Sequence, residues 1–289
     1  MEDYLLRIMA KDAGLLALVC STTQLADEAR QRHAAYPAAT AALGQGLTAA
    51  ALLGALLKVG QRVAFKVQGN GPLGQLIAEA DNFGRVRGYV IHPQATVPDG
   101  DDPMDLNASL GPVGLMTVVQ DLKLKDLYEG VIQRQGGRLD ADLVYYLTHS
   151  EQVPSLVEIG VQLAPQGTVR AAGGWLVQTL PGQAPSALLE LAERMEDLPD
   201  LEQLLTDGYT PEQVAAALFG PVPYDVLEKH PLRFTCSCSR EQSAQALLLL
   251  GRADLEELLQ EGEGVVDCHF CGERYTFDRQ ALRELLTQT

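Results

Sequence analysis

The chain has 289 residues, of which 46% are hydrophobic and 21% charged, and its formal net charge is −16. This length suffices for one large domain and a smaller one, and the composition is that of a globular protein, which excludes a disordered or fibrous chain. Residues 181–289 carry 20 acidic and 8 basic side chains, a net −12, against 18 and 14 in residues 1–180. Because nucleic-acid binding relies on basic side chains that neutralise phosphates, this distribution argues against a nucleic-acid partner.

The sequence predicts neither a membrane protein nor a secreted one. It contains no run of 18 or more apolar residues, which a transmembrane helix requires. Its first residues, MEDYLLRIMAKDAG, include two acidic residues at the start and lack the apolar stretch of a signal peptide. We therefore expect a cytoplasmic protein with no membrane partner, in which cysteines stay reduced or bind metal.

The chain begins with a pair of strands followed by two helices. The predicted elements are strands at 3–10 and 15–22, a charged helix at 24–35 and, after Pro37, a helix at 39–60. The second helix is so rich in alanine and leucine that we expect it to be buried in a core. Cys20, in the second strand, is expected to be a small buried apolar residue.

From Arg62 onward the hydrophobic period changes to two, which predicts an antiparallel meander. The strands are expected at 62–69, 73–80, 85–92 and 113–120, with a further strand and turn at 125–136. Four prolines in residues 93–112 predict a surface loop. A helix capped by Asp140 is expected at 140–152, and a hairpin at 154–165 and 168–181. Together these elements predict one α+β domain, residues 1–180, with an antiparallel sheet and packed helices.

Residues 181–230 predict a linker of three short helices. The helical patterns are broken at Pro199 and at Gly208–Pro211, and Thr210 with Gln213 has the spacing of a capping box. The apolar stripes are Leu188, Leu191 and Met195; Leu201, Leu204 and Leu205; and Val214, Leu218 and Phe219. Since helices this short are unstable alone, we expect the stripes to pack on the sheet domain.

Four of the five cysteines lie in residues 231–289, as a C-x-C and a C-x-x-C. The pairs are Cys236 with Cys238 and Cys268 with Cys271, separated by 29 residues. Two such pairs are typical of a four-thiolate zinc site, although a zinc ribbon usually has C-x-x-C in both places. We predict a small module that binds one zinc ion in its reduced state and depends on that metal for much of its stability.

Several local patterns complete this module. Ser239 and Gln242 predict a helix start, residues 265–277 predict a hairpin with the C-x-x-C at its turn, and Asp278 predicts the cap of a final helix. His269 could replace one thiolate, but four cysteines already complete the site. No H-x-x-x-H, H-E-x-x-H, G-x-S-x-G, P-loop or Rossmann motif is present. The sequence thus gives no catalytic residue, no organic cofactor and no reason to predict an enzyme.

The cysteine pattern and several earlier segments resemble the 33-kDa heat-shock chaperone family, the redox-regulated holdases of the bacterial cytosol. The resemblance rests on TCSCSRE, CHFCGERYTF, VAFKVQGNGPLGQLIAEAD and AAGGWLVQTLPG, and it spans nearly the whole chain. It implies a core chaperone domain at 1–180, a helical linker at 181–230 and a zinc-binding redox switch at 231–289.

The resemblance also implies an ATP-independent chaperone that is inactive when reduced and zinc-bound. Cys236, Cys238, Cys268 and Cys271 would be the zinc ligands, and oxidation would form the disulfides Cys236–Cys238 and Cys268–Cys271. Zinc would then be released, the switch and linker would unfold, and the active form, a homodimer in this family, would bind unfolding client proteins under oxidative stress.

Three alternatives remain at this point. A zinc module could bind nucleic acid, which the net charge opposes. Cys268 and Cys271 could serve a thiol–disulfide oxidoreductase, although a thioredoxin-like βαβ context is absent. The zinc could also be purely structural, in which case oxidation would only inactivate or aggregate the protein.

Overall fold

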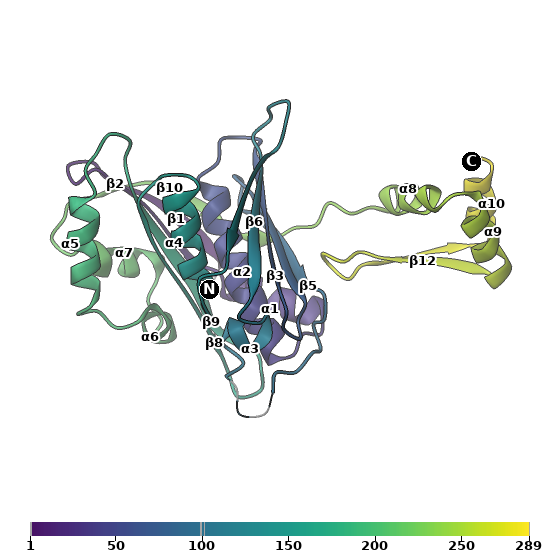
Figure 1. Cartoon of the computed structure of the whole chain (residues 1–289), viewed down its shortest axis with the longest axis horizontal. Helices are drawn as coiled ribbons and strands as arrows, with labels where there is room; N and C mark the ends of the chain where they lie inside the picture. Colours follow the sequence, from purple (N-terminus) through teal and green to yellow (C-terminus); the bar gives the residue numbers. More distant parts are fainter. Residues whose placement is uncertain (1, 99, 101, 289) are drawn as a thin grey trace. The chain divides into compact units, whose positions relative to one another are not determined.

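The computed structural model describes residues 2–98, 100 and 102–288 and divides into two compact units, Met1–Thr235 and Cys236–Thr289. In the first unit a long helix packs between two sheets (Figure 1). The second unit is a two-stranded hairpin with helices. The predicted α+β fold with antiparallel sheets and packed helices is confirmed.

The first sheet is antiparallel throughout, with the strand order β10–β1–β2–β9–β8. Its strands are β1 (Tyr4–Ala10), β2 (Leu15–Ser21), β8 (Ser155–Leu163), β9 (Val169–Thr179) and β10 (Asp225–Pro231). The two hairpins predicted here, β1–β2 and β8–β9, are confirmed. Strand β10 was not predicted, because six of its seven side chains are exposed and its apolar residues therefore do not alternate with polar ones.

The second sheet has the order β11–β5–β4–β3–β6–β7. Its strands are β3 (Arg62–Gly69), β4 (Gln75–Asp81), β5 (Arg85–Val90), β6 (Gly114–Asp121), β7 (Tyr128–Gln133) and β11 (Arg233–Phe234). The predicted simple meander is wrong after β5, since β6 pairs with β3 while β11 pairs with β5 in parallel. Period-two hydrophobicity identifies a strand but does not specify its neighbour.

The prediction of a surface loop at residues 93–112 is wrong for the second half of this segment. A short helix, α3 (Leu106–Ser109), lies there, and both Leu106 and Leu110 are completely buried. The prolines correctly predicted irregular backbone, but they gave no sign of the leucines that anchor it. Residues 99 and 101 lie outside the part of the chain that the structure describes.

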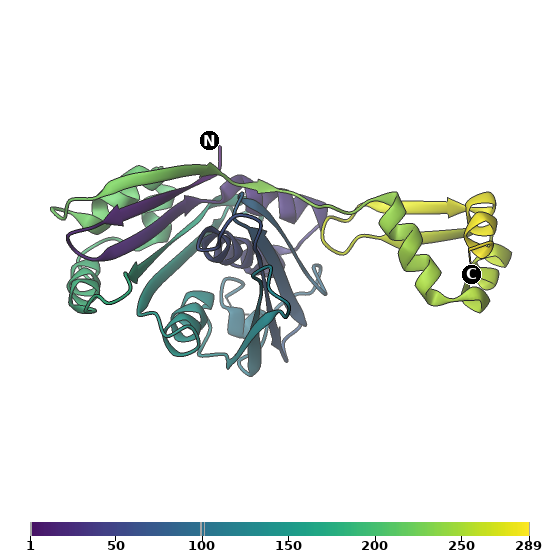
Figure 2. The same cartoon turned by 90° about the horizontal axis from the view of Figure 1, so that it is seen from above.

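The helices of the core follow the predicted patterns with shifted ends. They are α1 (Thr23–Arg32), α2 (Pro37–Ala55) and α4 (Leu139–His149). The predicted Asp140 cap is wrong: α4 begins after Arg138 without a side-chain cap, and Asp140 instead forms a salt bridge with Arg138. Helix α2 is long and apolar enough to cross a membrane, but 94% of its apolar window is buried inside the protein. It contacts strands of both sheets, as expected of a core helix (Figure 2).

Three further helices cover the outer face of the first sheet (Figure 1). They are α5 (Ser186–Met195), α6 (Leu201–Thr206) and α7 (Pro211–Phe219). Their apolar stripes pack on the sheet, and the Thr210–Gln213 capping box starts α7 as predicted. Strand β2 is therefore buried on both faces: Leu18 and Cys20 face the α2 side, and Ala17 and Val19 face the three helices.

Candidate metal centre

The second unit places its cysteines in two turns. Its elements are α8 (Arg240–Leu250), α9 (Arg252–Glu261), β12 (Glu263–Asp267), β13 (Arg274–Asp278) and α10 (Arg279–Leu286). Cys236 and Cys238 lie just before α8, whose first residues are capped when the Ser239 hydroxyl accepts a hydrogen bond from the Gln242 amide at 3.3 Å. The predicted Asp278 cap of α10 is also present, with the Ala281 amide as donor at 2.9 Å.

The C-x-x-C lies at the turn of the β12–β13 hairpin, as predicted. The Cys268 amide donates to the Glu273 carbonyl at 2.9 Å, and the Gly272 amide donates to the Cys268 carbonyl at 2.8 Å. Gly272 has a φ of 72°, a left-handed conformation that glycine adopts without the strain of a side chain. This tight turn holds the sulfurs of Cys268 and Cys271 on one side of the hairpin end.

The four sulfurs come together in space. The Sγ atoms of Cys236, Cys238, Cys268 and Cys271 all lie within 4.8 Å of one another. The Cys236–Cys268 distance is 3.7 Å and the Cys238–Cys271 distance is 3.4 Å. A Zn–S bond of about 2.3 Å implies sulfur–sulfur edges of about 3.8 Å in a tetrahedron. The donor set and its spacing therefore fit one tetrahedral metal ion, and all four cysteines are free thiols.

The surroundings of Cys268 and Cys271 favour the protonated thiols when no cation is present. Burial raises the pKa of the Cys271 thiol, and hydrogen bonds with Cys238 and Cys268 raise it further. Burial also raises the pKa of Cys268. A divalent cation would reverse this balance, because metal binding to cysteine displaces the thiol proton.

Sequence reasoning missed Tyr275. Its hydroxyl lies 3.2 Å from the Cys238 sulfur, and it projects from β13 in the same hairpin that carries the C-x-x-C. The pKa of Tyr275 is raised, first by this hydrogen bond and then by burial. The sequence did offer one indication that Tyr275 lies near the cysteines, because it follows Cys271 by four residues in the strand after the C-x-x-C turn.

The remaining candidates lie outside the cluster. Of the residues that the structure describes, the group of possible ligands holds the four cysteines and not His269. Cys20 is 1% exposed in the core of the first unit, as predicted, and burial raises the pKa of its thiol to about 12. A thiol this well buried and protonated is a poor nucleophile.

The core beneath the cluster is small. The buried hydrophobic residues are Leu247, Leu255, Phe277, Leu282 and Leu285. A core of this size supplies little stability to a unit with several separate elements, so a bound metal would contribute a large share.

Comparisons with known proteins give consistent matches. The family model described as Hsp33 protein matches residues 3–278. A 33 kDa chaperonin of Geobacter sp. (strain M21) is 45% identical over 289 residues, covering 100% of this chain and 98% of that protein. The 33 kDa chaperonin of Bacillus subtilis (strain 168) is 36% identical over 289 residues, covering 99% of each. The crystal structure of the 33 kDa chaperonin from Thermotoga maritima superposes with a TM-score of 0.90 at 30% identity, covering 99% of this chain and 98% of that one.

Proposed function

Because this chain belongs to the Hsp33 family, we propose that it is a redox-regulated, ATP-independent chaperone that binds unfolding proteins under oxidative stress. It is not an enzyme in this proposal. The observation that carries it is the gathering of four cysteine sulfurs within 4.8 Å in a unit with a very small core. We assign residues 1–180 as the chaperone core, 181–230 as the linker and 231–289 as the redox switch.

In the reduced state, Cys236, Cys238, Cys268 and Cys271 would hold one Zn²⁺ as thiolates. When bound, zinc keeps all four sulfurs deprotonated, and thiolates are the form of cysteine that oxidants attack. Each disulfide, Cys236–Cys238 or Cys268–Cys271, forms as two thiolates transfer two electrons to the oxidant. With hydrogen peroxide, two protons are consumed and two waters are released for each disulfide. The oxidised sulfurs are no longer metal ligands, so the unit loses the contribution of the metal to its stability.

The linker supplies the apolar surface in this proposal. Helices α5, α6 and α7 bury their stripes against the outer face of the first sheet, where Leu191, Leu201 and Leu218 are at most 3% exposed. If the linker loosens after the switch unfolds, both these stripes and the sheet face beneath them become available to clients. The linker would thus cover the client-binding surface in the reduced protein.

We further propose a cytoplasmic protein that dimerises in its active state and has unfolded proteins, not nucleic acids or membranes, as partners. The net charge of −16 supports the exclusion of nucleic acids, because a strongly negative chain repels them, and it keeps the chain soluble when apolar surface is exposed.

One paired experiment tests the switch. Metal content, free thiols and aggregation of a heat-denatured client are measured before and after oxidation with hydrogen peroxide under mild unfolding stress. We expect one zinc lost per chain, four thiols consumed and aggregation suppressed only after oxidation. If zinc is lost and the client still aggregates, the cysteines are purely structural and the redox proposal is wrong.

A further inference from the structure

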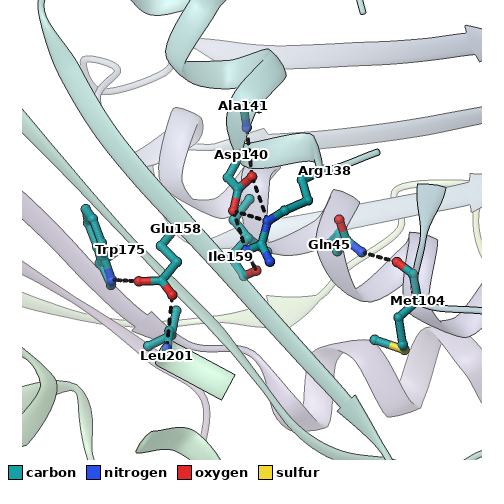
Figure 3. A network of polar contacts seen from close by, with 9 residues as sticks. All are labelled: Gln45, Met104, Arg138, Asp140, Ala141, Glu158, Ile159, Trp175 and Leu201. Atoms are coloured by element: carbon teal, nitrogen blue, oxygen red, sulfur yellow. Dashed lines mark hydrogen bonds and ion pairs between the residues drawn. The ribbon is translucent and has the colours of Figure 1, made fainter. Parts of the chain in front are cut away.

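Two glutamates join linker helix α6 to the edge strand β8 of the first sheet. Glu158, on β8, accepts hydrogen bonds at 3.0 Å from the backbone amide of Leu201 and at 3.0 Å from the indole Nε1 of Trp175 (Figure 3). Glu202, on α6, packs against Gly160 of β8, and its carboxylate lies near the backbone amide of Val161. Each element thus places one carboxylate against the backbone of the other. We call Glu158 and Glu202 the carboxylate clasp.

The clasp takes the place of a helix cap. Asp200, directly before α6, makes no side-chain cap, so the first amide of the helix depends on Glu158. Helix α6 spans only Leu201–Thr206 and could not persist away from the sheet. The clasp therefore adds to the apolar contacts that dock this part of the linker.

The positive charge near the clasp does not balance its carboxylates. Arg138 faces both glutamates, but its guanidinium forms a salt bridge with Asp140 at 2.7 Å (Figure 3). Within the described part of the chain, neither clasp glutamate has a salt bridge of its own within 4.0 Å. The groups that face the clasp are Arg138 and Asp140 from the start of α4, and Asp200 from the loop before α6. Four carboxylates consequently share one guanidinium.

The clasp is also partly removed from water. A cavity of about 150 Å³ adjoins it, lined by Glu158, Trp175 and Asp200 together with apolar linker residues. Burial raises the pKa of Glu158, and burial likewise raises that of Glu202. In both cases burial outweighs the opposing effects of the amide hydrogen bonds and of Arg138.

We propose that Glu158 and Glu202 are a proton-linked clasp that makes docking of α6 weaker as pH rises and stronger as the pair takes up a proton. This inference rests on the proposed function only in identifying the linker as the segment that is released. It gives the linker a second control besides the cysteines. At neutral pH the charged clasp favours dissociation of α6 from the first sheet. The linker can therefore undock once the switch unfolds.

The direction follows from linkage. In the undocked state both side chains are in water and have ordinary pKa values, so the docked state binds a proton more tightly. The stabilisation is complete below the ordinary glutamate pKa and is lost as pH rises through the raised values. Glu212 on α7, whose carboxylate accepts hydrogen bonds from Tyr4 and Lys229, has a pKa lowered to about 2. Its opposite contribution is lost only below about pH 5.

Trp175 makes the clasp measurable, because it is the only tryptophan of the chain, is 2% exposed and donates directly to Glu158. Tryptophan emission of the reduced, zinc-loaded full-length protein is followed in urea titrations between about pH 5.5 and about pH 8, with metal content measured at each pH. The key variant is Glu202→Gln, which keeps the size of the side chain and removes its charge. Glu193→Gln, an exposed glutamate on α5, is the matched control for the change in net charge.

We expect the urea midpoint of the wild type to fall as pH rises. Glu202→Gln should show a smaller fall than the wild type and should have the higher midpoint at the upper end of the range, whereas Glu193→Gln should follow the wild type. After peroxide treatment at neutral pH, Trp175 should stay buried longer in Glu202→Gln. The inference is overturned if the urea midpoint of Glu202→Gln falls with pH as steeply as that of the wild type. It is also overturned if the wild-type midpoint rises with pH. Because the pH dependence of the midpoint is measured on the reduced protein, it tests the clasp even if oxidation fails to produce chaperone activity.

Discussion

At the residue scale, the neighbours of the cysteines distinguish them from one another. Cys271 is buried, whereas Cys236, Cys238 and Cys268 are only partly covered, and Cys238 has the hydroxyl of Tyr275 at 3.2 Å. The sequence predicted the four sulfurs because ligand spacing is a local property. It did not predict the Tyr275 contact, which depends on how the hairpin end packs beside Cys238.

We expect Tyr275→Phe to speed oxidation of the zinc-loaded protein. A hydroxyl that donates to a thiolate withdraws electron density from it, so removing the donor should make the Cys238 sulfur more reactive. Removing an outer-shell partner of a metal ligand typically changes metal affinity or activity by about 10- to 100-fold. For this partly exposed contact we expect the oxidation rate to change by about 10-fold or less. The rate of thiol loss with peroxide is the measurement. Tyr36→Phe, at an exposed tyrosine of the first unit, is the control, and equal rates in all three proteins would remove Tyr275 from the site.

Asp3 gives a pH dependence to the stability of the first unit. Its carboxyl is 4% exposed and accepts from the Leu25 amide at 2.7 Å, and burial raises its pKa to about 6. Since the folded state binds this proton more tightly than the unfolded chain, stability falls as pH rises through about 6, by at most about 3 kcal/mol. We expect Asp3→Asn to remove this part of the pH slope in urea denaturation. Asp12→Asn, in an exposed turn, should retain it, and an identical loss in both variants would contradict the assignment.

At the element scale, the linker helices are short but each is attached to the sheet in a specific way. Helix α5 contributes Leu188 and Leu191 to the buried face, α6 is held through Glu158, and α7 begins with a capping box at Thr210. None of these helices would persist alone, so their stability is that of the interface. A weakened cap therefore acts on linker release and not on the fold of the core.

We expect Thr210→Ala to destabilise the docked linker by about 1 kcal/mol, since the lost cap leaves helix amides of α7 unsatisfied. The oxidised variant should suppress client aggregation at a lower temperature or a shorter oxidation time than the wild type. Thr168→Ala, in the β8–β9 turn, is the comparison variant. Activation of Thr210→Ala that is no earlier than that of Thr168→Ala would show that α7 docking does not limit release.

Elements with a regular hydrophobic period could be predicted from the sequence, and those defined by distant partners could not. The linker helices and the first hairpin were found because their stripes are local. Strand β10 was missed because backbone pairing with β1, and not burial of its side chains, holds it in place. The predicted neighbour of β6 was wrong because hydrophobic alternation identifies a strand but not the strand it pairs with.

At the scale of the whole molecule, stability is divided unequally. The unit Met1–Thr235 holds a large core around α2, whereas Cys236–Thr289 has a few buried leucines and one phenylalanine in addition to its cysteines. The sequence predicted that so small a module depends on a metal for much of its stability, but it did not show which of its leucines are buried. The inequality means that loss of metal should affect one unit and spare the other.

We expect a chelator to unfold residues 236–289 while the first unit stays folded. Trypsin should then cut the reduced protein rapidly at Arg252 and Arg274, both exposed, and leave a resistant fragment close to Met1–Thr235. Restoring zinc should restore resistance. Unchanged cleavage after chelation would show that the second unit does not depend on metal.

The sheet position of β10 has a consequence for the proposed return of the chaperone to its inactive state. The linker helices leave the first sheet after β9 and the chain returns to the same sheet at β10, so they form a loop tied at both ends. Such a tether keeps the released helices at an effective concentration in the millimolar range beside their docking face. The linker is then a permanent intramolecular competitor for the surface that clients would occupy. In the proposed redox cycle, reduction of the disulfides and return of zinc would let the linker displace a bound client without any nucleotide.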